Sequence, residues 1–171
     1  MSYKTKLPNI DTFIFDVDGV LTDGSVYLLK DEVARVLNSR DGYALQYASK
    51  LGYNIFVISG GNSIPVKKRL LGLGVKEVLL QSSSKLEAFQ DLQKRYGFKT
   101  ETTVYMGDDI PDYDVMNVVG VAACPQDAAV EIKTISHYQS PYDGGRHCVR
   151  DIIEQTLRSQ GKWFGELSKQ W

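Results

Sequence analysis

Short apolar runs alternate with segments of helical period along most of the chain. The apolar runs are rich in β-branched residues: TFIFDV (12–17), NIFVIS (54–59), KEVLLQ (76–81) and TTVYMG (102–107). The segments of helical period are GYALQYASKLG (42–52), SIPVKKRLLGLG (63–74), SKLEAFQDLQKRYG (84–97) and PDYDVMNVVG (111–120). This alternation predicts βαβ units, and therefore a doubly wound α/β domain in which helices cover both faces of a parallel sheet.

The segment after the first predicted strand does not follow this alternation of strand and helix patterns. Two strand-like runs, joined through Lys30, Asp31 and Glu32, predict a β-hairpin at 24–38. A projecting hairpin exposes strand edges and apolar side chains, which proteins usually cover by assembly, so we expect a homo-oligomer. The alternative is a hairpin that folds back onto its own domain. Near the other end, HCVRDIIEQTLRSQG (147–161) predicts a closing helix, and a short tail follows at 161–171.

Length and composition narrow the class of protein. Residues 1–171 contain no linker or internal repeat and are expected to form one domain. The formal net charge of −1 provides no basic field for nucleic acid or an acidic membrane, and no run of eighteen apolar residues occurs. We therefore expect a cytoplasmic protein that binds neither nucleic acid nor a membrane, with both cysteines as free thiols.

Acidic residues gather at the carboxyl ends of the predicted strands, where parallel sheets bind ligands. Asp16 and Asp18 end the first strand, Ser59 ends the second, and Asp108 and Asp109 follow the fourth. Carboxylates that converge repel one another unless a cation lies among them, and hard oxygen ligands without a Cys or His cluster favour Mg²⁺. A single aspartate at a strand end is more often a helix cap or turn former, so only the combination indicates a metal site.

Two aspartates one residue apart can have different roles if the chain turns sharply at Gly19. Asp16 would be the nucleophile, and Asp18 would protonate a leaving oxygen and later deprotonate water. Phosphoryl transfer also needs positive charge and hydrogen-bond donors for the transferring oxygens. Lys85 and the turn SGGNS, which begins at Ser59, are the candidates. The pattern therefore favours phosphoryl transfer through an aspartyl-phosphate.

Four motifs of the chain resemble those of the haloacid dehalogenase superfamily of phosphotransferases. They are DVDGVLTDG (16–24), the turn at Ser59, Lys85 and GDDIPD (107–112), and the likeness covers nearly the whole chain. The resemblance implies a Mg²⁺-dependent phosphomonoesterase. It also implies that Asp16, Asp108 and the backbone carbonyl of Asp18 bind Mg²⁺ and that Ser59 and Lys85 hold the phosphoryl oxygens. Asp109 and Asp112 would shape the metal loop without binding the ion.

More narrowly, the chain resembles the capless branch that contains 3-deoxy-D-manno-octulosonate 8-phosphate (KDO 8-phosphate) phosphatase, which acts in lipopolysaccharide precursor synthesis. The hairpin, NSRDGYAL (38–45), KLEAF (85–89) and GGR (144–146) carry this likeness. It implies a homotetramer assembled through the hairpins, in which a neighbouring subunit helps to close each site in place of a cap domain.

This branch also implies a set of residues that bind the sugar acid of the substrate. They are Asn38, Ser39, Arg40, Asp41 and Gly42 on the loop after the hairpin, together with Arg69 and Arg146. The planar fork of arginine suits a carboxylate because it can bind both oxygens at once. Two positions depart from the pattern, since Gly61 and Gln46 stand where many members have arginine.

Three other functions stay open at this point. A related branch acts on a nine-carbon ketodeoxy sugar acid 9-phosphate, and Gly61 fits neither branch. A phospho-accepting signalling domain also combines an acidic cluster with Ser or Thr and Lys, but its acceptor aspartate ends the middle strand, where this chain has Ser59. A catalytically silent scaffold is the third alternative, although no motif residue is missing.

Overall fold

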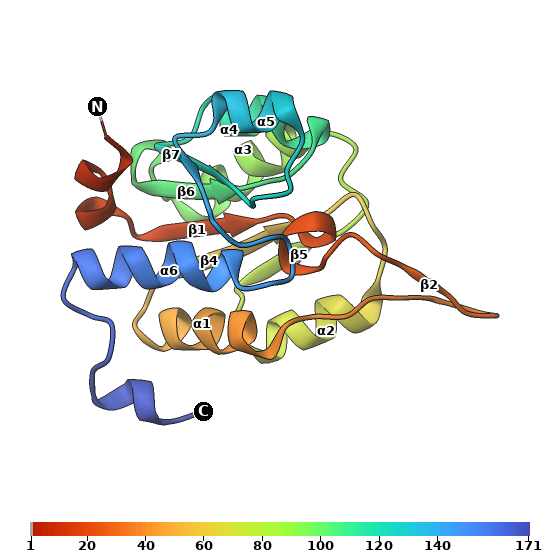
Figure 1. Ribbon diagram of the computed structural model, residues 1–171, viewed down its shortest axis with the longest axis horizontal. Helices are drawn as coiled ribbons and strands as arrows, with labels where there is room; N and C mark the ends of the chain where they lie inside the picture. Colours follow the sequence, from red (N-terminus) through yellow and green to blue (C-terminus); the bar gives the residue numbers. More distant parts are fainter. Residues whose placement is uncertain (1) are drawn as a thin grey trace.

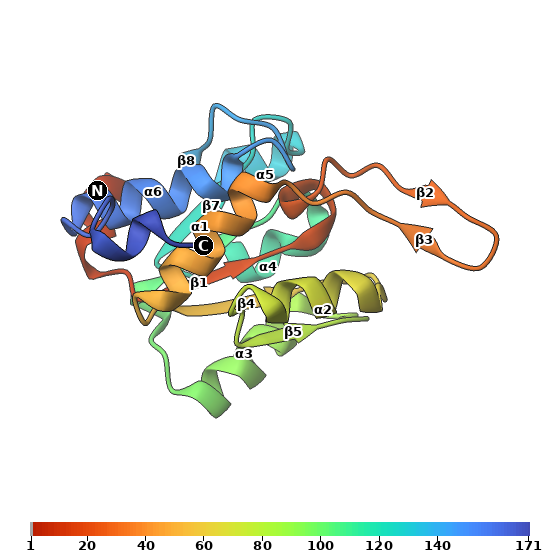
Figure 2. The same cartoon turned by 90° about the horizontal axis from the view of Figure 1, so that it is seen from below.

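The first strand of the chain lies at the centre of the sheet. The computed structural model describes residues 2–171, and within them six parallel strands form one sheet in the order β5–β4–β1–β6–β7–β8 (Figures 1 and 2). The strands are β1 (Thr12–Phe15), β4 (Asn54–Ile58), β5 (Glu77–Leu79), β6 (Thr103–Met106), β7 (Val121–Cys124) and β8 (Tyr138–Gln139). The chain winds outward from β1 in both directions, so the strand order reverses there, which is where open α/β sheets bind ligands.

The register of the three central strands aligns their carboxyl ends. Phe15 of β1 lies opposite Val57 of β4 on one side and Met106 of β6 on the other. The residues that follow these strands therefore emerge side by side. All four residues of β1 are buried, as is typical of a parallel strand covered on both faces.

Helices cover both faces of this sheet (Figures 1 and 2). On one face lie α1 (Ser39–Lys50), α2 (Ile64–Gly72) and α6 (Cys148–Ser159), and on the other lie α3 (Lys85–Tyr96), α4 (Tyr113–Met116) and α5 (Val130–Ile135). The alternation of side chains along β1 divides the core accordingly, since Phe13 and Phe15 pack with the first group and Ile14 with the second. The predicted α/β fold with helices on both faces is therefore confirmed.

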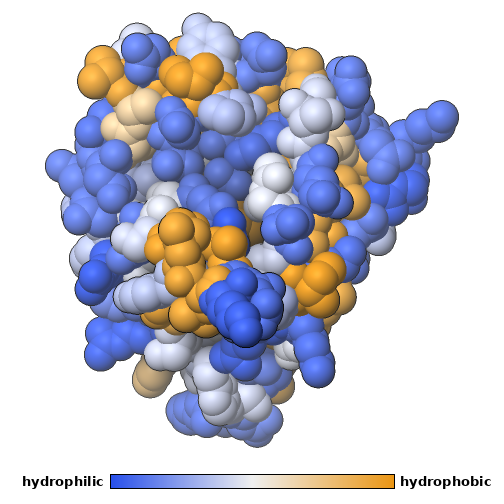
Figure 3. Space-filling model, turned by 90° about the vertical axis from the view of Figure 1, so that its right-hand side faces the viewer, coloured by the Kyte–Doolittle hydropathy of each residue, from blue (hydrophilic) through white to orange (hydrophobic). Residues whose placement is uncertain are grey.

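The predicted hairpin after the first strand is also confirmed. Strands β2 (Tyr27–Leu28) and β3 (Val33–Ala34) pair antiparallel and project from the body of the domain (Figures 1 and 2). The side chain of Leu28 is 80% exposed, and Tyr27 is exposed beside it. Viewed end-on, this side of the molecule has apolar surface next to the strongly polar tip of the hairpin (Figure 3). The hairpin thus extends into solvent in the single chain.

The residues after the hairpin form a helix, so the predicted loop at 38–42 is wrong. The Asn38 side chain accepts hydrogen bonds from the backbone N–H groups of Arg40 (2.9 Å) and Asp41 (3.3 Å) and caps α1, which therefore includes Ser39 to Gly42. The buried carboxylate of Asp41 in turn accepts the backbone N–H groups of His147 (3.2 Å) and Arg150 (2.8 Å) at the start of α6. Asp41 thus joins two helices of the same layer.

Other differences from the predicted elements are local. The segment 111–120 is not one helix but a short 3-10 turn, η5 (Ile110–Asp112), followed by α4, because Asp109 and Asp112 form a capping box around Pro111. The closing helix is confirmed as α6, whose buried face includes Val149, Ile152, Ile153 and Leu157. Both cysteines are buried free thiols, and no helix within residues 2–171 has the length and apolar character needed to span a membrane.

Candidate active site

A cavity of about 500 Å³ opens where the carboxyl ends of β1, β4 and β6 meet. Seven of the residues singled out from the sequence line it: Asp16, Asp18, Ser59, Lys85, Asp108, Asp109 and Asp112. Backbone and small side chains complete the lining: Gly19, Gly24, Gly60, Gly61, Ser82, Ser83 and Pro111. The expected convergence of the strand ends is therefore observed within one chain.

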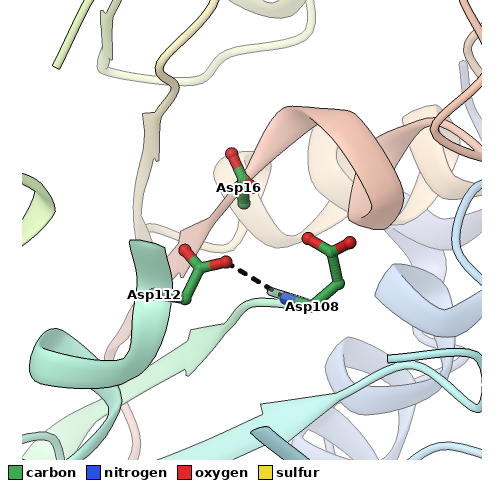
Figure 4. Close-up of side chains that lie close together, drawn as sticks. All are labelled: Asp16, Asp108 and Asp112. Carbon is green, nitrogen blue, oxygen red and sulfur yellow. Dashed lines mark hydrogen bonds between the residues drawn. The ribbon is translucent and has the colours of Figure 1, made fainter. Parts of the chain in front are cut away.

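Three carboxylates meet at the base of the cavity (Figure 4). Asp16 follows β1, Asp108 follows β6, and Asp112 ends η5, and one oxygen of each lies within 4.8 Å of the others. Asp16 and Asp112 are buried and Asp108 is partly buried. Burying several carboxylates together costs several kcal/mol each unless positive charge or hydrogen-bond donors compensate.

Lys85 supplies part of this compensation. Its Nζ lies 2.8 Å from Asp16 Oδ2 and 2.6 Å from Asp112 Oδ1, and the whole lysine is buried at the first position of α3. Burial acts to lower the pKa of Lys85, but Asp112 and Asp16 outweigh it and the net pKa is raised. One ammonium group faces three carboxylates, so the cluster carries excess negative charge when all three are ionised.

Asp112 is fully engaged by the protein. Its Oδ1 accepts hydrogen bonds from Lys85 Nζ and from the hydroxyl of Tyr105, each at 2.6 Å. Its Oδ2 accepts the backbone N–H groups of Asp108 (3.1 Å) and Asp109 (3.4 Å), the first of which is drawn in Figure 4. Asp112 therefore orients the loop that carries Asp108 and has no oxygen free for another ligand.

The hydrogen bonding of Asp108 differs from that of Asp112. Its Oδ1 is buried and has no hydrogen-bond partner among the described residues. Burial, followed by the charges of Asp16 and Asp112, raises the pKa of Asp108 to about 8, and burial also raises the pKa of Asp16. A divalent cation between Asp16 and Asp108 would fill the open coordination of Oδ1 and balance the two negative charges, so these donors fit Mg²⁺.

The chain makes the expected sharp turn at Gly19. This residue has φ = +85°, and a Cβ atom there would stand 1.9 Å from Asp108 Oδ2, so only glycine fits. The Asp18 carboxylate is not part of the cluster formed by the other three aspartates and faces the hairpin. There the Asp18 carboxylate pairs with Arg35, with 2.6 Å between Oδ1 and Nε.

Ser59 is buried at the end of β4, next to the acidic cluster. The backbone N–H of Gly61 donates to Ser59 Oγ at 3.1 Å, and the N–H of Ser82 donates to the Ser59 carbonyl at 3.0 Å. These bonds fix the turn after β4 against the loop after β5. Ser59 therefore approaches the cavity from the turn after β4, and Lys85 approaches it from the start of α3.

The residues expected to bind a sugar acid lie outside this cavity. Asn38, Ser39, Gly42 and Arg69 line a small hollow between α1 and α2. Arg40 and Arg146 line two further hollows on the same side of the sheet as α1 and α6. Arg40, Arg69 and Arg146 are all exposed. Within one chain, these residues and the acidic cluster are not brought together.

Two residues of the site were not identified from the sequence. Tyr105 lies in the interior of β6, where an aromatic residue is expected for packing alone, and its hydroxyl position relative to Asp112 has no sequence signal. Arg35 follows β3 in the hairpin, and its contact with Asp18 depends on how the hairpin leaves the domain. Both contacts are set by tertiary structure.

Comparisons with known proteins agree with these features. The family model described as haloacid dehalogenase-like hydrolase matches residues 71–145. The 3-deoxy-D-manno-octulosonate 8-phosphate phosphatase KdsC of Salmonella typhi is 35% identical over 159 residues, which are 92% of this chain and 85% of that protein.

Solved structures are similar over almost the whole chain. The 3-deoxy-D-manno-octulosonate 8-phosphate phosphatase of Moraxella catarrhalis, in complex with a magnesium ion, a phosphate ion and KDO, has a TM-score of 0.89 at 28% identity, covering 93% of this chain and 92% of that one. The cobalt-bound phosphatase YrbI of Haemophilus influenzae has a TM-score of 0.88 at 32% identity, with 92% of both chains covered.

The raised pKa values of Asp16 and Asp108 make the stability of the metal-free protein depend on pH. Carboxyls in an unfolded chain titrate near ~4, so between about pH 4 and pH 8 the folded protein binds more protons than the unfolded one. The free energy of unfolding should therefore fall as the pH rises through this range. In EDTA, we expect Asp108→Asn to have a higher melting temperature than the wild type at pH 8, and the difference to shrink toward pH 5.

A divalent cation should reverse this trend, because it competes with protons for the carboxylates. The increase in melting temperature on adding Mg²⁺ to the wild type should be larger at pH 8 than at pH 5 and should be absent in Asp108→Asn. A Mg²⁺ effect of equal size in both proteins would contradict the assignment of Asp108. Asp114→Asn, which alters an exposed aspartate of α4, is the matched control.

Proposed function

The chain belongs to the haloacid dehalogenase-like hydrolases and, among them, to the KdsC-type family of 3-deoxy-D-manno-octulosonate 8-phosphate phosphatases. We propose that it hydrolyses KDO 8-phosphate to KDO and phosphate. It is a phosphatase of this superfamily. One arrangement supports the proposal most directly: Asp16 is bound to Lys85, and close to it Asp108 Oδ1 has no hydrogen-bond partner among the described residues.

Asp16 would attack the phosphorus atom. Its Oδ1 accepts the backbone N–H of Val17 at 2.6 Å and its Oδ2 contacts Lys85, so the carboxylate is held in one orientation at the floor of the cavity. The new bond joins an Asp16 oxygen to phosphorus, while the bond between phosphorus and the sugar oxygen breaks. Lys85 and Ser59 would bind the oxygens of the transferring group, and Lys85 would also limit the negative charge on Asp16.

Asp18 would act as the general acid and then as the general base. It would donate a proton to the sugar oxygen as that oxygen leaves, and it would then accept one from the water that attacks the aspartyl-phosphate. Its position on the open side of the cavity, away from the acidic cluster, suits both steps. Water attack restores Asp16 and releases phosphate, so the chain returns to its starting state.

Mg²⁺ would be held by Asp16, Asp108 and the backbone carbonyl of Asp18, and it would supply the positive charge that attracts the phosphate and stabilises its oxygens. Asp109 and Asp112 would serve this site without binding the ion. For Asp112 this follows from its four hydrogen bonds, which leave no free oxygen.

The sugar acid would be bound with help from a neighbouring subunit of a homotetramer. The exposed apolar hairpin at 24–38 offers a surface for assembly, and the exposed arginines Arg40, Arg69 and Arg146 do not line the cavity of their own acidic cluster. Asn38, Ser39 and Gly42 would contribute from the same segment. Asp41 would act indirectly, because both of its oxygens accept backbone N–H groups of α6.

A steady-state comparison of substrates tests the proposed function. Phosphate release should require Mg²⁺, and kcat/KM should be at least about tenfold higher for KDO 8-phosphate than for a nine-carbon ketodeoxy sugar acid 9-phosphate or for hexose phosphates. Asp16→Asn should lower kcat by about 10⁴-fold or more, because it removes the nucleophile and little else. Asp114→Asn should leave kcat unchanged.

Two outcomes would contradict this proposal. Higher kcat/KM for hexose phosphates would refute the substrate, and near wild-type turnover in Asp16→Asn would refute the mechanism. A preference for the nine-carbon substrate would move the protein to the related branch while leaving the phosphatase chemistry intact.

The proposed assembly can be tested at the hairpin. Leu28→Lys adds a charge at an exposed position, so the fold should be unaffected, but the tetramer should dissociate. KM for KDO 8-phosphate should then rise by about tenfold, a loss of ~1.4 kcal/mol of binding. Light scattering gives the mass, and Val118→Lys, at another exposed apolar residue, is the control. A monomeric wild type, or a tetrameric Leu28→Lys with unchanged KM, would refute the assembly.

A further inference from the structure

Arg35 is the second cation that contacts an aspartate of the active site. It follows β3 in the hairpin and reaches back to Asp18, with Nε 2.6 Å from Oδ1 and Nη2 3.0 Å from Oδ2. The contact is bidentate, which fixes the direction of both side chains as well as their separation. The side chain of Arg35 is only 9% exposed, whereas that of Asp18 is 37% exposed.

The turn after β4 leaves room for this pair. A Cβ atom at Gly61 would stand 3.2 Å from Arg35 Nη2 and 3.5 Å from Asp18 Oδ2, so the guanidinium lies directly against the glycine backbone. Asp18 and Gly61 both line the cavity. The Arg35 guanidinium therefore bridges three segments: the turn after β1, the turn after β4, and the hairpin.

The two cations of the site hold different kinds of partner. Lys85 is bound to the buried carboxylates of Asp16 and Asp112, whereas Arg35 is bound to the partly exposed carboxylate of Asp18. Among the described residues, Arg35 is the only hydrogen-bond partner of the Asp18 carboxylate. Without it, Asp18 would rotate freely, and ordering a side chain during the reaction costs free energy.

We propose that Arg35 is a positioning residue that holds the Asp18 carboxyl group through Oδ1, the oxygen with the shorter contact, so that Oδ2 can leave Nη2, take up a proton and pass it to the leaving oxygen. This inference rests on the proposed function, in which Asp18 gives a proton to the leaving oxygen. Because Arg35 belongs to the hairpin, the placement of the hairpin and the placement of Asp18 are linked. Arg35 transfers no proton and forms no bond to phosphorus.

Kinetics can distinguish a variant with a misplaced general acid from a variant that has lost structure. Proton donation matters most for a basic leaving oxygen and least for an acidic one, so a misplaced acid should steepen the dependence of kcat/KM on the leaving group. A series of substituted phenyl phosphates measures this dependence without involving a carboxylate on the substrate.

For Arg35→Ala we expect kcat/KM to fall by about 10²-fold for phenyl phosphate and by less than about tenfold for 4-nitrophenyl phosphate. Arg35→Lys keeps the charge but loses the fork and should lie between Arg35→Ala and the wild type. Added guanidinium ion, at concentrations well below those that unfold the protein, should restore part of the Arg35→Ala loss. The control is Arg95→Ala on α3, which breaks an exposed bidentate pair between Arg95 and Glu77 of β5.

The same loss for every ester, or no loss at all, would overturn the proposal for Arg35. A loss confined to KDO 8-phosphate would also overturn it, because Arg35 would then bind the sugar acid instead of positioning Asp18. Failure of the proposed function is distinct from these results: the wild type itself would then release no phosphate from any ester in Mg²⁺.

Discussion

The active site depends on the burial of three carboxylates around one lysine. Asp16 follows β1, whereas Asp108 and Asp112 lie on the loop after β6, and the register of β1 and β6 together with the start of α3 at Lys85 brings the charged groups together. Burying this much negative charge is unfavourable by several kcal/mol per ion. The protein offsets the charge at Asp16 and Asp112 through Lys85 and Tyr105, whereas Asp108 Oδ1 has no hydrogen-bond partner within residues 2–171. This arrangement fits a divalent cation beside Asp108.

The same electrostatic arrangement separates the roles of identical side chains. Asp112 has its oxygens saturated by hydrogen bonds, so it supports the loop, whereas Asp108 keeps an oxygen open. Asp16 is held by Lys85 at the floor of the cavity, and Asp18, which precedes the sharp turn at Gly19, pairs with Arg35 of the hairpin. Four aspartates thus differ in their partners and burial, and a nucleophile, a metal ligand, an acid and a structural residue can be proposed from these differences.

Much of the fold and the acidic site could be predicted because both follow local patterns. Alternation of apolar runs with helical segments indicated the sheet and its layers, and the rule that ligands bind at strand ends placed Asp16, Ser59 and Asp108 in one predicted site. Features set by tertiary contacts could not be predicted from the sequence. Helix α1 begins at Ser39 because Asn38 caps it, and Arg35 reaches Asp18 only through the path of the hairpin. Strand β7 (VAAC) lacks the run of β-branched residues that marked the predicted strands, and β8 has only two residues.

The central claim is that Asp16 and Asp108, and not Asp112, share one divalent cation. Anomalous diffraction from crystals soaked in Mn²⁺, an oxygen-seeking ion that substitutes for Mg²⁺, locates such an ion without reference to activity. The account requires one peak in contact with carboxylate oxygens of Asp16 and Asp108, with Asp112 still bound to Lys85 and Tyr105. A peak coordinated by Asp112 in place of Asp108, or no peak in this cavity, would contradict it.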